Sequence, residues 1–228
     1  MYKKIIRSFI FISLVVVTSV VAKDLPNGFV ELKTYIPTIK LDIRYYTSDN
    51  FVGKRIDGYE SPKALLTKQA AESLKNVQDE LVIFGLSLKV YDAYRPQRAV
   101  DHFVRWAKDL KDTKMKLKYY PKVDKENLFS EGYIFNKSGH SRGSTVDVTI
   151  VSLDDTESAE LDMGTNWDFF SPSSWPQSPL VTMQQRANRA LLYYVMKKHG
   201  FMILNKEWWH FTLENEPYPN RYFDFPIQ

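Results

Sequence analysis

The sequence predicts an α+β domain in which helices pack around an antiparallel sheet. Three segments carry apolar residues at spacings of three or four, which is typical of helices with one face in a core. Several shorter segments alternate apolar and polar residues, as strands do. The strands do not alternate regularly with the helices, and the last two follow each other closely. This order favours an antiparallel sheet over a parallel one.

Residues 1–22 are expected to be a signal peptide. Three basic residues precede an apolar stretch, residues 8–21, which has the length of a signal-peptide core and is short for a membrane span. Ala22 is a small residue suited to cleavage before Lys23. An uncleaved anchor is the alternative, but cleavage is favoured. We therefore expect an exported protein, periplasmic or secreted, with no stable membrane association once the segment is removed.

The charge balance gives no support to nucleic-acid binding. The chain has 31 basic and 27 acidic residues, a net charge of +4. Lys3, Lys4 and Arg7 leave with residues 1–22, which contain no acidic residue, so 28 basic and 27 acidic residues remain, a net charge of +1. The 206 remaining residues, 23–228, suit one domain with a sizeable core. The sequence has no cysteine, so disulfides are excluded even though export would permit them.

The first half of the domain is expected to begin with short strands and turns. Residues 23–49 contain short apolar and β-branched runs, such as 29–30 and 39–43, and residues 49–53 are predicted to form a loop. Ser61-Pro62 is expected to begin a helix, because proline is favoured at an early helical position. Gly85 is a plausible end for that helix. Its core-facing stripe is Leu66, Ala70, Leu74, Val77 and Leu81.

A strand is predicted over residues 88–94, and Arg95-Pro96 ends it and opens a second helix. This junction places Arg95 where a side chain can point into a cleft, although a surface salt bridge is the more frequent role of a single arginine. Residues 111–137 and 152–181 are expected to be irregular. The buried side of the second helix is predicted to comprise Val100, Phe103, Val104, Ala107 and Leu110.

The last part of the chain is predicted to form a helix followed by a hairpin. Thr182 and Gln185 have the spacing of a capping box, and the helix should end at Gly200. Residues 201–205 and 208–213 then form two close strands. The side of the helix expected to face the core comprises Ala187, Ala190, Leu191, Tyr194 and Val195.

Two distant stretches bring histidines and carboxylates together, and they predict a metal site. Without cysteine, a tight zinc site must use imidazole nitrogens and carboxylate oxygens, and a catalytic site needs three protein ligands and an open position. His140, Asp147 and His210 would supply the ligands and leave Glu207 free to act as a base. Either pattern alone is weak evidence, because a lone histidine is usually a satisfied surface or core residue.

Local geometry favours the first stretch and complicates the second. Val146, Val148 and Ile150 alternate with polar residues, so Asp147 should project from the face opposite a buried one. Gly143 permits a tight turn that folds His140 back beside it. Positions 207 and 210 lie on opposite faces of a regular strand, so a bulge or a turn that opens the strand is required. The other two histidines, His102 and His199, are not assigned to the metal.

Taken together, the motifs resemble the D-alanyl-D-alanine dipeptidases, zinc enzymes related to the D,D-carboxypeptidases and to the Hedgehog signalling domain. The resemblance spans nearly all of residues 23–228, in order, and departs from the family at Thr145, where alanine is common. The matching pieces are Asp49-Asn50-Phe51-Val52-Gly53, Asp57-Gly58-Tyr59-Glu60, Tyr94-Arg95-Pro96, Ser138-Gly139-His140-Ser141-Arg142-Gly143, Met163-Gly164-Thr165 with Asp168-Phe169-Phe170, Glu207-Trp208-Trp209-His210, and the tail segments 216–220 and 222–226.

The resemblance implies one zinc ion per chain, a small dipeptide substrate and a division of roles. His140, Asp147 and His210 resemble the zinc ligands, Glu207 the general base, and Arg95 the cation that stabilises the oxyanion. Five further residues match positions that line the substrate pocket, where the two aspartates would pair with the substrate ammonium and the others would hydrogen-bond its ends. They are Tyr45, Tyr59, Asp92, Ser138 and Asp168.

Other functions on the same fold stay open at this point. One is a peptidoglycan D,D-carboxypeptidase or L,D-type peptidase. The dipeptidase-like pocket motifs favour a dipeptidase over this alternative. Another is a zinc-bearing binding module without catalysis, which has no need of Glu207 and Arg95. Because an exported enzyme does not meet the cytoplasmic pool of precursor dipeptide, the expected role is scavenging or turnover of wall-derived D-Ala-D-Ala.

Overall fold

The computed structural model describes residues 25–154 and 159–228. The expected signal peptide, residues 1–22, and the boundary at Lys23 lie outside the described residues. The elements, in chain order, are β1 Phe29–Glu31, α1 Leu32–Tyr35, β2 Lys40–Leu41, η1 Arg44–Tyr46, β3 Leu65–Thr67, α2 Lys68–Val82, β4 Leu86–Asp92, α3 Gln97–Lys108, α4 Lys116–Tyr119, η2 Lys125–Asn127, η3 Gly139–Arg142, β5 Thr145–Ser152, η4 Pro172–Ser174, α5 Met183–Lys198, β6 Phe201–Ile203 and β7 His210–Leu213.

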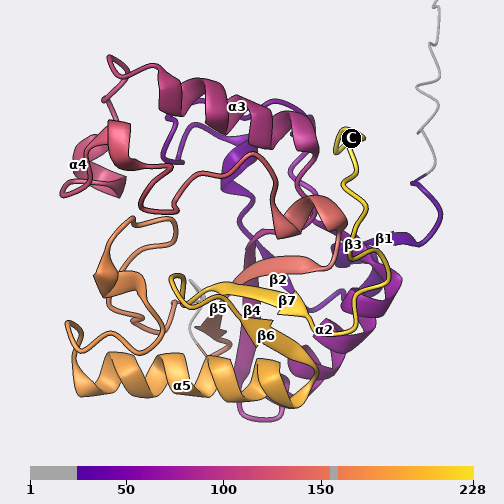
Figure 1. Ribbon diagram of the computed structural model, residues 1–228. Helices are drawn as coiled ribbons and strands as arrows, with labels where there is room; N and C mark the ends of the chain where they lie inside the picture. Colours follow the sequence, from indigo (N-terminus) through magenta and orange to yellow (C-terminus); the bar gives the residue numbers. More distant parts are fainter. Residues whose placement is uncertain (1–24, 155–158) are drawn as a thin grey trace, which may run out of the picture.

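A five-stranded sheet of order β2-β4-β5-β7-β6 forms the centre of the domain, and β1 and β3 form a separate antiparallel pair. Figure 1 shows α3 and α5 at opposite ends of the molecule, with the strands of the sheet between them. The α+β prediction is confirmed, and so is the final hairpin of β6 and β7. One edge differs from the expectation, because the two-residue strand β2 runs parallel to β4.

The first long helix begins later than the sequence predicted. Leu65–Thr67 pair with Phe29–Glu31 as strand β3, so Ser61-Pro62 do not open the helix. Thr67 is the N-cap instead, and its hydroxyl accepts a hydrogen bond from the backbone N–H of Ala70 at 3.4 Å. The predicted stripe is buried, but its first member, Leu66, belongs to the strand.

Strand β5 is covered on both faces, whereas the alternation predicted one buried and one open face. All residues from Thr145 to Val151 are buried, the polar ones included. Val148 and Ile150 lie beside Val90 and Leu88 of β4 on one face. Asp147 points to the other face, beneath loops that the sequence pattern alone could not place over the sheet.

The buried face of α5 also differs from the prediction. Thr182 and Gln185 form the expected capping box, but Leu191 and Tyr194 are exposed. The buried positions are Arg189, Leu192, Val195 and Met196. Arg189 donates to three backbone carbonyls, those of Met163, Ser173 and Trp175. Because this buried residue is charged rather than apolar, the periodicity of apolar residues did not indicate which face of the helix is buried.

Helix α3 supplies part of the aromatic packing beneath the functional region. Phe103 packs against Tyr45 and Phe51, with ring centroids 5.0 and 4.8 Å apart. Val104 is half-buried and packs against the core, whereas Leu110 is exposed beyond the end of the helix and was wrongly placed on its buried side. The stretch 111–137 contains the short helices α4 and η2 within otherwise irregular chain. None of the helices in the described ranges has the length and apolar character that a membrane crossing requires.

Candidate metal centre and substrate cleft

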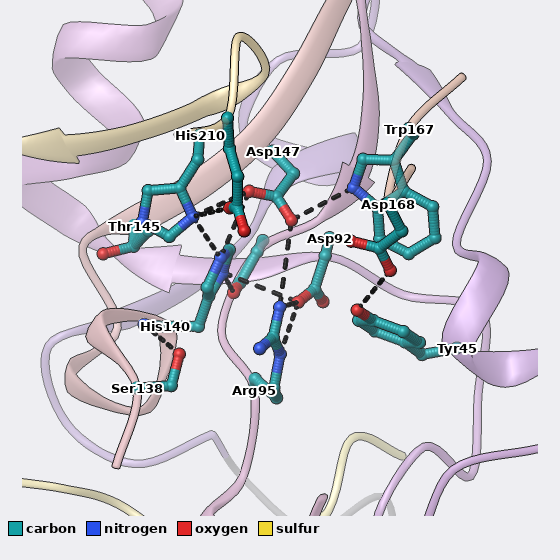
Figure 2. Close-up of polar contacts among 12 residues, drawn as sticks. Tyr45, Asp92, Arg95, Ser138, His140, Thr145, Asp147, Trp167, Asp168 and His210 are labelled. Atoms are coloured by element: carbon teal, nitrogen blue, oxygen red, sulfur yellow. Dashed lines mark hydrogen bonds and ion pairs between the residues drawn. The ribbon is translucent and has the colours of Figure 1, made fainter. Parts of the chain in front are cut away.

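Two neighbouring strands and one short helix place the three predicted ligands together. Asp147 of β5 lies directly opposite His210, the first residue of β7, in the antiparallel pairing. His140 lies on η3, which immediately precedes β5. Figure 2 shows the two imidazoles and the Asp147 carboxylate pointing toward one another. The predicted juxtaposition of the two distant stretches is therefore present.

A glycine turn brings His140 back over the sheet, as expected. Gly143 follows η3 with φ of 85°, a left-handed conformation that favours glycine. A Cβ atom at this position would meet the Phe29 ring at 2.4 Å, so the close approach of the β1 region excludes a side chain. The Gly143 carbonyl accepts a hydrogen bond from the backbone N–H of Thr67, which fastens the turn to β3.

The three ligand atoms have the spacing that a metal ion requires. The distances between His140 Nε2 and Asp147 Oδ1, between His210 Nδ1 and Asp147 Oδ1, and between the two nitrogens are each 3.2 Å. A tetrahedral metal with nitrogen and oxygen ligands at about 2.0–2.2 Å holds its ligand atoms about 3.3 Å apart. Among the described residues, His140, Asp147 and His210 form the group of histidines and carboxylates that could hold a metal ion.

Hydrogen bonds orient two of the ligands. The Nδ1 of His140 lies 2.7 Å from the Ala93 carbonyl, to which it donates, so Nε2 presents its lone pair to the site. Burial lowers the pKa of His140, which favours the neutral, metal-binding imidazole. The indole N–H of Trp167 donates to Asp147 Oδ2 at 3.1 Å. Asp147 Oδ1 is buried and accepts no hydrogen bond from the described residues, which leaves that oxygen for a cation.

Glu207 reaches the same site from a turn. Strand β7 begins only at His210, and the backbone N–H of His210 donates to the Glu207 carbonyl at 3.4 Å. This is the turn that the three-residue spacing required. The Glu207 Oε2 atom lies 3.4 Å from His210 Nδ1, and the side chain borders the cleft. Burial raises the pKa of Glu207, against the opposing effect of His210.

Arg95 lies near the Oδ2 atom of Asp147, whereas the two histidines lie at its Oδ1 atom. It follows β4, and its backbone N–H donates to the His140 carbonyl at 3.3 Å. The Nε and Nη2 atoms each lie 2.9 Å from Asp92 Oδ2, and Nη2 lies 3.8 Å from Asp147 Oδ2. The guanidinium also lies over the Tyr45 ring, 5.0 Å from its centroid. The predicted position of Arg95 at the wall of a cleft is present.

A cleft of about 240 Å³ opens over these groups. That volume is below the range of roughly 300–1,000 Å³ for sites that take drug-sized ligands, so the cleft suits a small substrate. Tyr45, Ser138 and Asp168 border it, together with Glu207 and Arg95. The Tyr45 hydroxyl donates to Asp168 Oδ2 at 2.6 Å. Burial raises the pKa of Asp168 well above its ordinary value, and the nearby Asp147 carboxylate adds to the effect.

Comparison with known proteins decides the family. A model of the D-ala-D-ala dipeptidase family matches residues 26–228. Proteins named D-alanyl-D-alanine dipeptidase are similar along most of the chain. That of Enterococcus faecium is 39% identical over 201 residues, 88% of this chain and 98% of its own. That of Streptomyces coelicolor is 40% identical over the same shares, and that of Escherichia coli 32% identical over 81% of this chain and 83% of its own.

The chain belongs to the D-ala-D-ala dipeptidase family. It is therefore a metallopeptidase. The triad of His140, Asp147 and His210 provides nitrogen and oxygen ligand atoms that suit a divalent metal. The match covers every element of the described structure from β1 to β7, so it accounts for the whole fold rather than for the metal motif alone.

Two of the five expected pocket residues lie behind the cleft rather than along it. The Asp92 side chain is 1% exposed and accepts from Arg95 and, at 2.5 Å, from the Tyr59 hydroxyl. A shift of register between Val90 and Asp92 places Asp92 opposite Asp147, where Arg95 covers it. Tyr59 and Asp92 thus hold Arg95 in place, and the pairing of Asp92 with a substrate ammonium stays a prediction.

Trp167 is the site residue that the sequence reasoning missed. It comes from the irregular stretch after β5, and its ring stacks on Tyr91 at 5.5 Å while its N–H holds Asp147. The only available signal was its position directly before Asp168. Thr145, the departure from the family pattern, pairs its hydroxyl with that of Thr212 at 2.8 Å and changes no ligand.

The remaining histidines have other partners in this family member. The Nδ1 atom of His102 accepts from the backbone N–H of Asp57 at 3.1 Å. His199 caps the end of α5 and lies 2.8 Å from a Glu80 carboxylate oxygen. Neither belongs to the metal triad, which agrees with their exclusion on sequence grounds.

Replacement of any triad residue by alanine should release the metal. We expect one divalent ion per wild-type chain by elemental mass spectrometry. The variants His140→Ala, Asp147→Ala and His210→Ala should lose more affinity than the roughly 10–100-fold that loss of an outer hydrogen-bond partner costs. His102→Ala and His199→Ala are the matched controls and should keep the ion. Full metal content in His210→Ala would contradict the ligand set.

Proposed function

We propose that this enzyme is a zinc-dependent dipeptidase that hydrolyses D-alanyl-D-alanine to two molecules of D-alanine. The observation that carries the proposal is a small cleft bordered by Asp147 and His210 of the His-Asp-His triad, by Glu207 and by Asp168. The similar proteins are named for this substrate. A non-catalytic binding module has no use for Glu207 and Arg95 beside the triad.

Zinc is the metal that best suits this donor set. Two imidazole nitrogens and one carboxylate oxygen, at tetrahedral spacing and without thiolates, are a frequent catalytic zinc environment. When bound, zinc supplies Lewis acidity at the floor of the cleft. The ligands that hold it would be His140, Asp147 and His210.

Glu207 would act as the general base and then as the general acid. Its carboxylate borders the cleft without being one of the three ligands, so it can take a proton from the attacking water and pass it to the leaving amine. Burial raises the pKa of Glu207 from its ordinary value toward neutral pH, which suits a group that must both accept and return a proton. The negative charge that develops on the scissile carbonyl oxygen would be stabilised by Arg95, whose guanidinium is already fixed by Asp92.

Asp168 and Tyr45 would bind the free amino group of the substrate. The buried Asp168 carboxylate has one hydrogen bond from Tyr45 and no cation of the described residues in an ion pair, so an incoming ammonium would supply the missing charge. Ser138 borders the same cleft and can hydrogen-bond the other end of a dipeptide. This need for a free amine favours a dipeptidase over a carboxypeptidase that acts on longer wall peptides.

We also propose that the enzyme works outside the cytoplasm on dipeptide released from the cell wall. The support is the basic and apolar character of residues 1–22.

The substrate assignment predicts selectivity for a free amine. The wild-type enzyme should hydrolyse D-Ala-D-Ala in a chelator-sensitive way and should reject N-acetyl-D-Ala-D-Ala by roughly 100- to 1,000-fold in kcat/KM, because acetylation leaves the buried Asp168 carboxylate without its cation. Asp168→Asn, which keeps the shape and tolerates the φ of 57° at this position, should lose most of that preference. Asp162→Asn, an exposed aspartate on the same segment, is the control. Equal kcat/KM for both peptides in the wild type would favour the carboxypeptidase.

The two catalytic residues should be separable from metal binding. Glu207→Gln should keep one zinc ion and lose about 10²–10⁴ in kcat, the usual value of a positioned acid–base group. Arg95→Lys should also keep zinc, and its kcat should fall more than its KM rises, because the planar guanidinium acts mainly in the transition state. Metal analysis and steady-state kinetics on the same preparations provide the measurement. Loss of zinc in Glu207→Gln would make Glu207 a ligand.

Export predicts a mature protein that begins at Lys23. Intact-mass analysis of the protein from its native host should find residues 1–22 absent and the activity outside the cytoplasmic fraction. An intact N-terminus in the cytoplasm would refute both the location and the scavenging role.

A further inference from the structure

A free dipeptide carries two charges, and the site described so far accounts for one of them. The ammonium is matched by Asp168, and the C-terminal carboxylate needs a cation of its own. Apart from the ligand His210, the basic side chains that border the cleft within the described residues are Arg95 and Lys137. If a charged group of the protein pairs with each end of the dipeptide, Arg95 or Lys137 must bind the substrate carboxylate.

Arg95 is already committed to other groups. Its Nε atom donates to Asp92 Oδ2 at 2.9 Å, its Nη2 atom lies 2.9 Å from the same oxygen, and its side chain is 12% exposed. It also lies within 4 Å of Asp147 and over two aromatic rings, those of Tyr45 and Phe103. Moving this guanidinium to the end of a substrate would leave the Asp92 carboxylate buried without its cation, which is costly.

Lys137 is free of such partners. It is exposed, and within the described ranges no carboxylate lies at ion-pair distance from its ammonium. The Nζ atom lies 4.6 Å from the centroid of the Tyr222 ring, a contact worth little at an exposed site. The backbone on either side is held, because the Asn136 carbonyl accepts from Gln97 of α3 at 2.9 Å and Ser138 caps η3. A flexible cation therefore rises from a fixed position at the edge of the cleft.

The position suits the end of the substrate that Asp168 does not hold. Figure 2 shows Ser138, the neighbour of Lys137, on one side of Arg95 and the Tyr45–Asp168 pair on the other. A dipeptide with its ammonium at Asp168 would extend its carboxylate toward Ser138, with the scissile carbonyl between the ends and close to Arg95.

We propose that Lys137 binds the C-terminal carboxylate of the substrate, together with the Ser138 hydroxyl, and selects peptides that end in a free acid. This assignment rests on the proposed dipeptidase function and adds a specificity-determining residue to it. The carboxylate keeps its charge throughout hydrolysis, so the contact stabilises the bound substrate and the transition state alike. Its loss should therefore raise KM and leave kcat nearly unchanged.

The test compares D-Ala-D-Ala with its C-terminal amide, D-alanyl-D-alaninamide, which lacks the negative charge. Wild type should prefer the free acid. Lys137→Met should lower kcat/KM for the free acid by roughly 10- to 100-fold, the range for a lost hydrogen bond to a charged group, mostly through KM. The same variant should treat the amide as wild type does, so the preference disappears. Lys137→Arg should restore much of it.

Lys197→Met is the matched control, because Lys197 is another exposed lysine over a tyrosine ring, 5.5 Å from Tyr193, and lies on α5 away from the cleft. It should keep the full preference for the free acid. An active wild type whose Lys137→Met variant retains that preference, or loses activity equally on both peptides, would overturn the assignment of Lys137 alone. A metal-loaded wild type that hydrolyses neither peptide would overturn the dipeptidase function and, with it, this role.

Discussion

The charge of Asp147 is buried in the middle of a sheet, and the rest of the site is arranged around that constraint. The side chain is 1% exposed on a strand that is covered on both faces. Burial raises the pKa of Asp147, but His140 and His210 outweigh that effect and lower it below its ordinary value. The Trp167 N–H donates a hydrogen bond to Asp147 Oδ2, and Oδ1 faces the two imidazoles. A divalent cation between Oδ1 and the two imidazole nitrogens would be bound by all three ligand atoms at once.

The surrounding charges show why the cleft attracts further positive charge. Asp92, Asp168 and Glu207 add three carboxyl groups to Asp147, whereas Arg95 is bound to Asp92. The excess of acidic groups helps to raise the pKa of Asp168 and of Glu207, since each lies near the Asp147 charge. A metal ion and a substrate ammonium are the two cations that relieve this imbalance. The electrostatics of the site thus agree with a metallopeptidase and with the proposed binding of a substrate amine.

Much of this arrangement could be read from the sequence, and the failures have identifiable causes. The metal triad was accessible because each ligand lies in a short motif whose turn or strand has a clear local signal, such as Gly143. The start of α2 was misplaced because the β1–β3 pairing, a tertiary contact, overrides the preference of Pro62 for a helix start. The face of α5 was missed because Arg189 is buried by hydrogen bonds to carbonyls rather than by apolar character.

The contacts that support the site depend on long-range geometry in the same way. Asp92 lies opposite Asp147 because of a register shift in β4, and nothing in the strand pattern marks that shift. Trp167 reaches Asp147 across 20 positions of chain, most of it irregular. Both residues act on the metal triad or on Arg95 through hydrogen bonds, and such supporting contacts have no sequence spacing of their own.

Charge at both ends of the cleft also offers a physical basis for a limit on substrate length. Each additional residue lengthens an extended peptide by about 3.3–3.6 Å, which exceeds the roughly 2.7–3.2 Å span of a hydrogen bond. A tripeptide held by its ammonium at Asp168 would carry its carboxylate past the Lys137–Ser138 edge, and a wall peptide without a free amine would leave Asp168 unpaired. Volume alone discriminates weakly, because a rim of exposed side chains such as Phe135 can move. With the proposed role of Lys137, a carboxylate at Asp168 and a cation at the Lys137–Ser138 edge, with Arg95 between them, would select length more sharply than the walls of the cleft do.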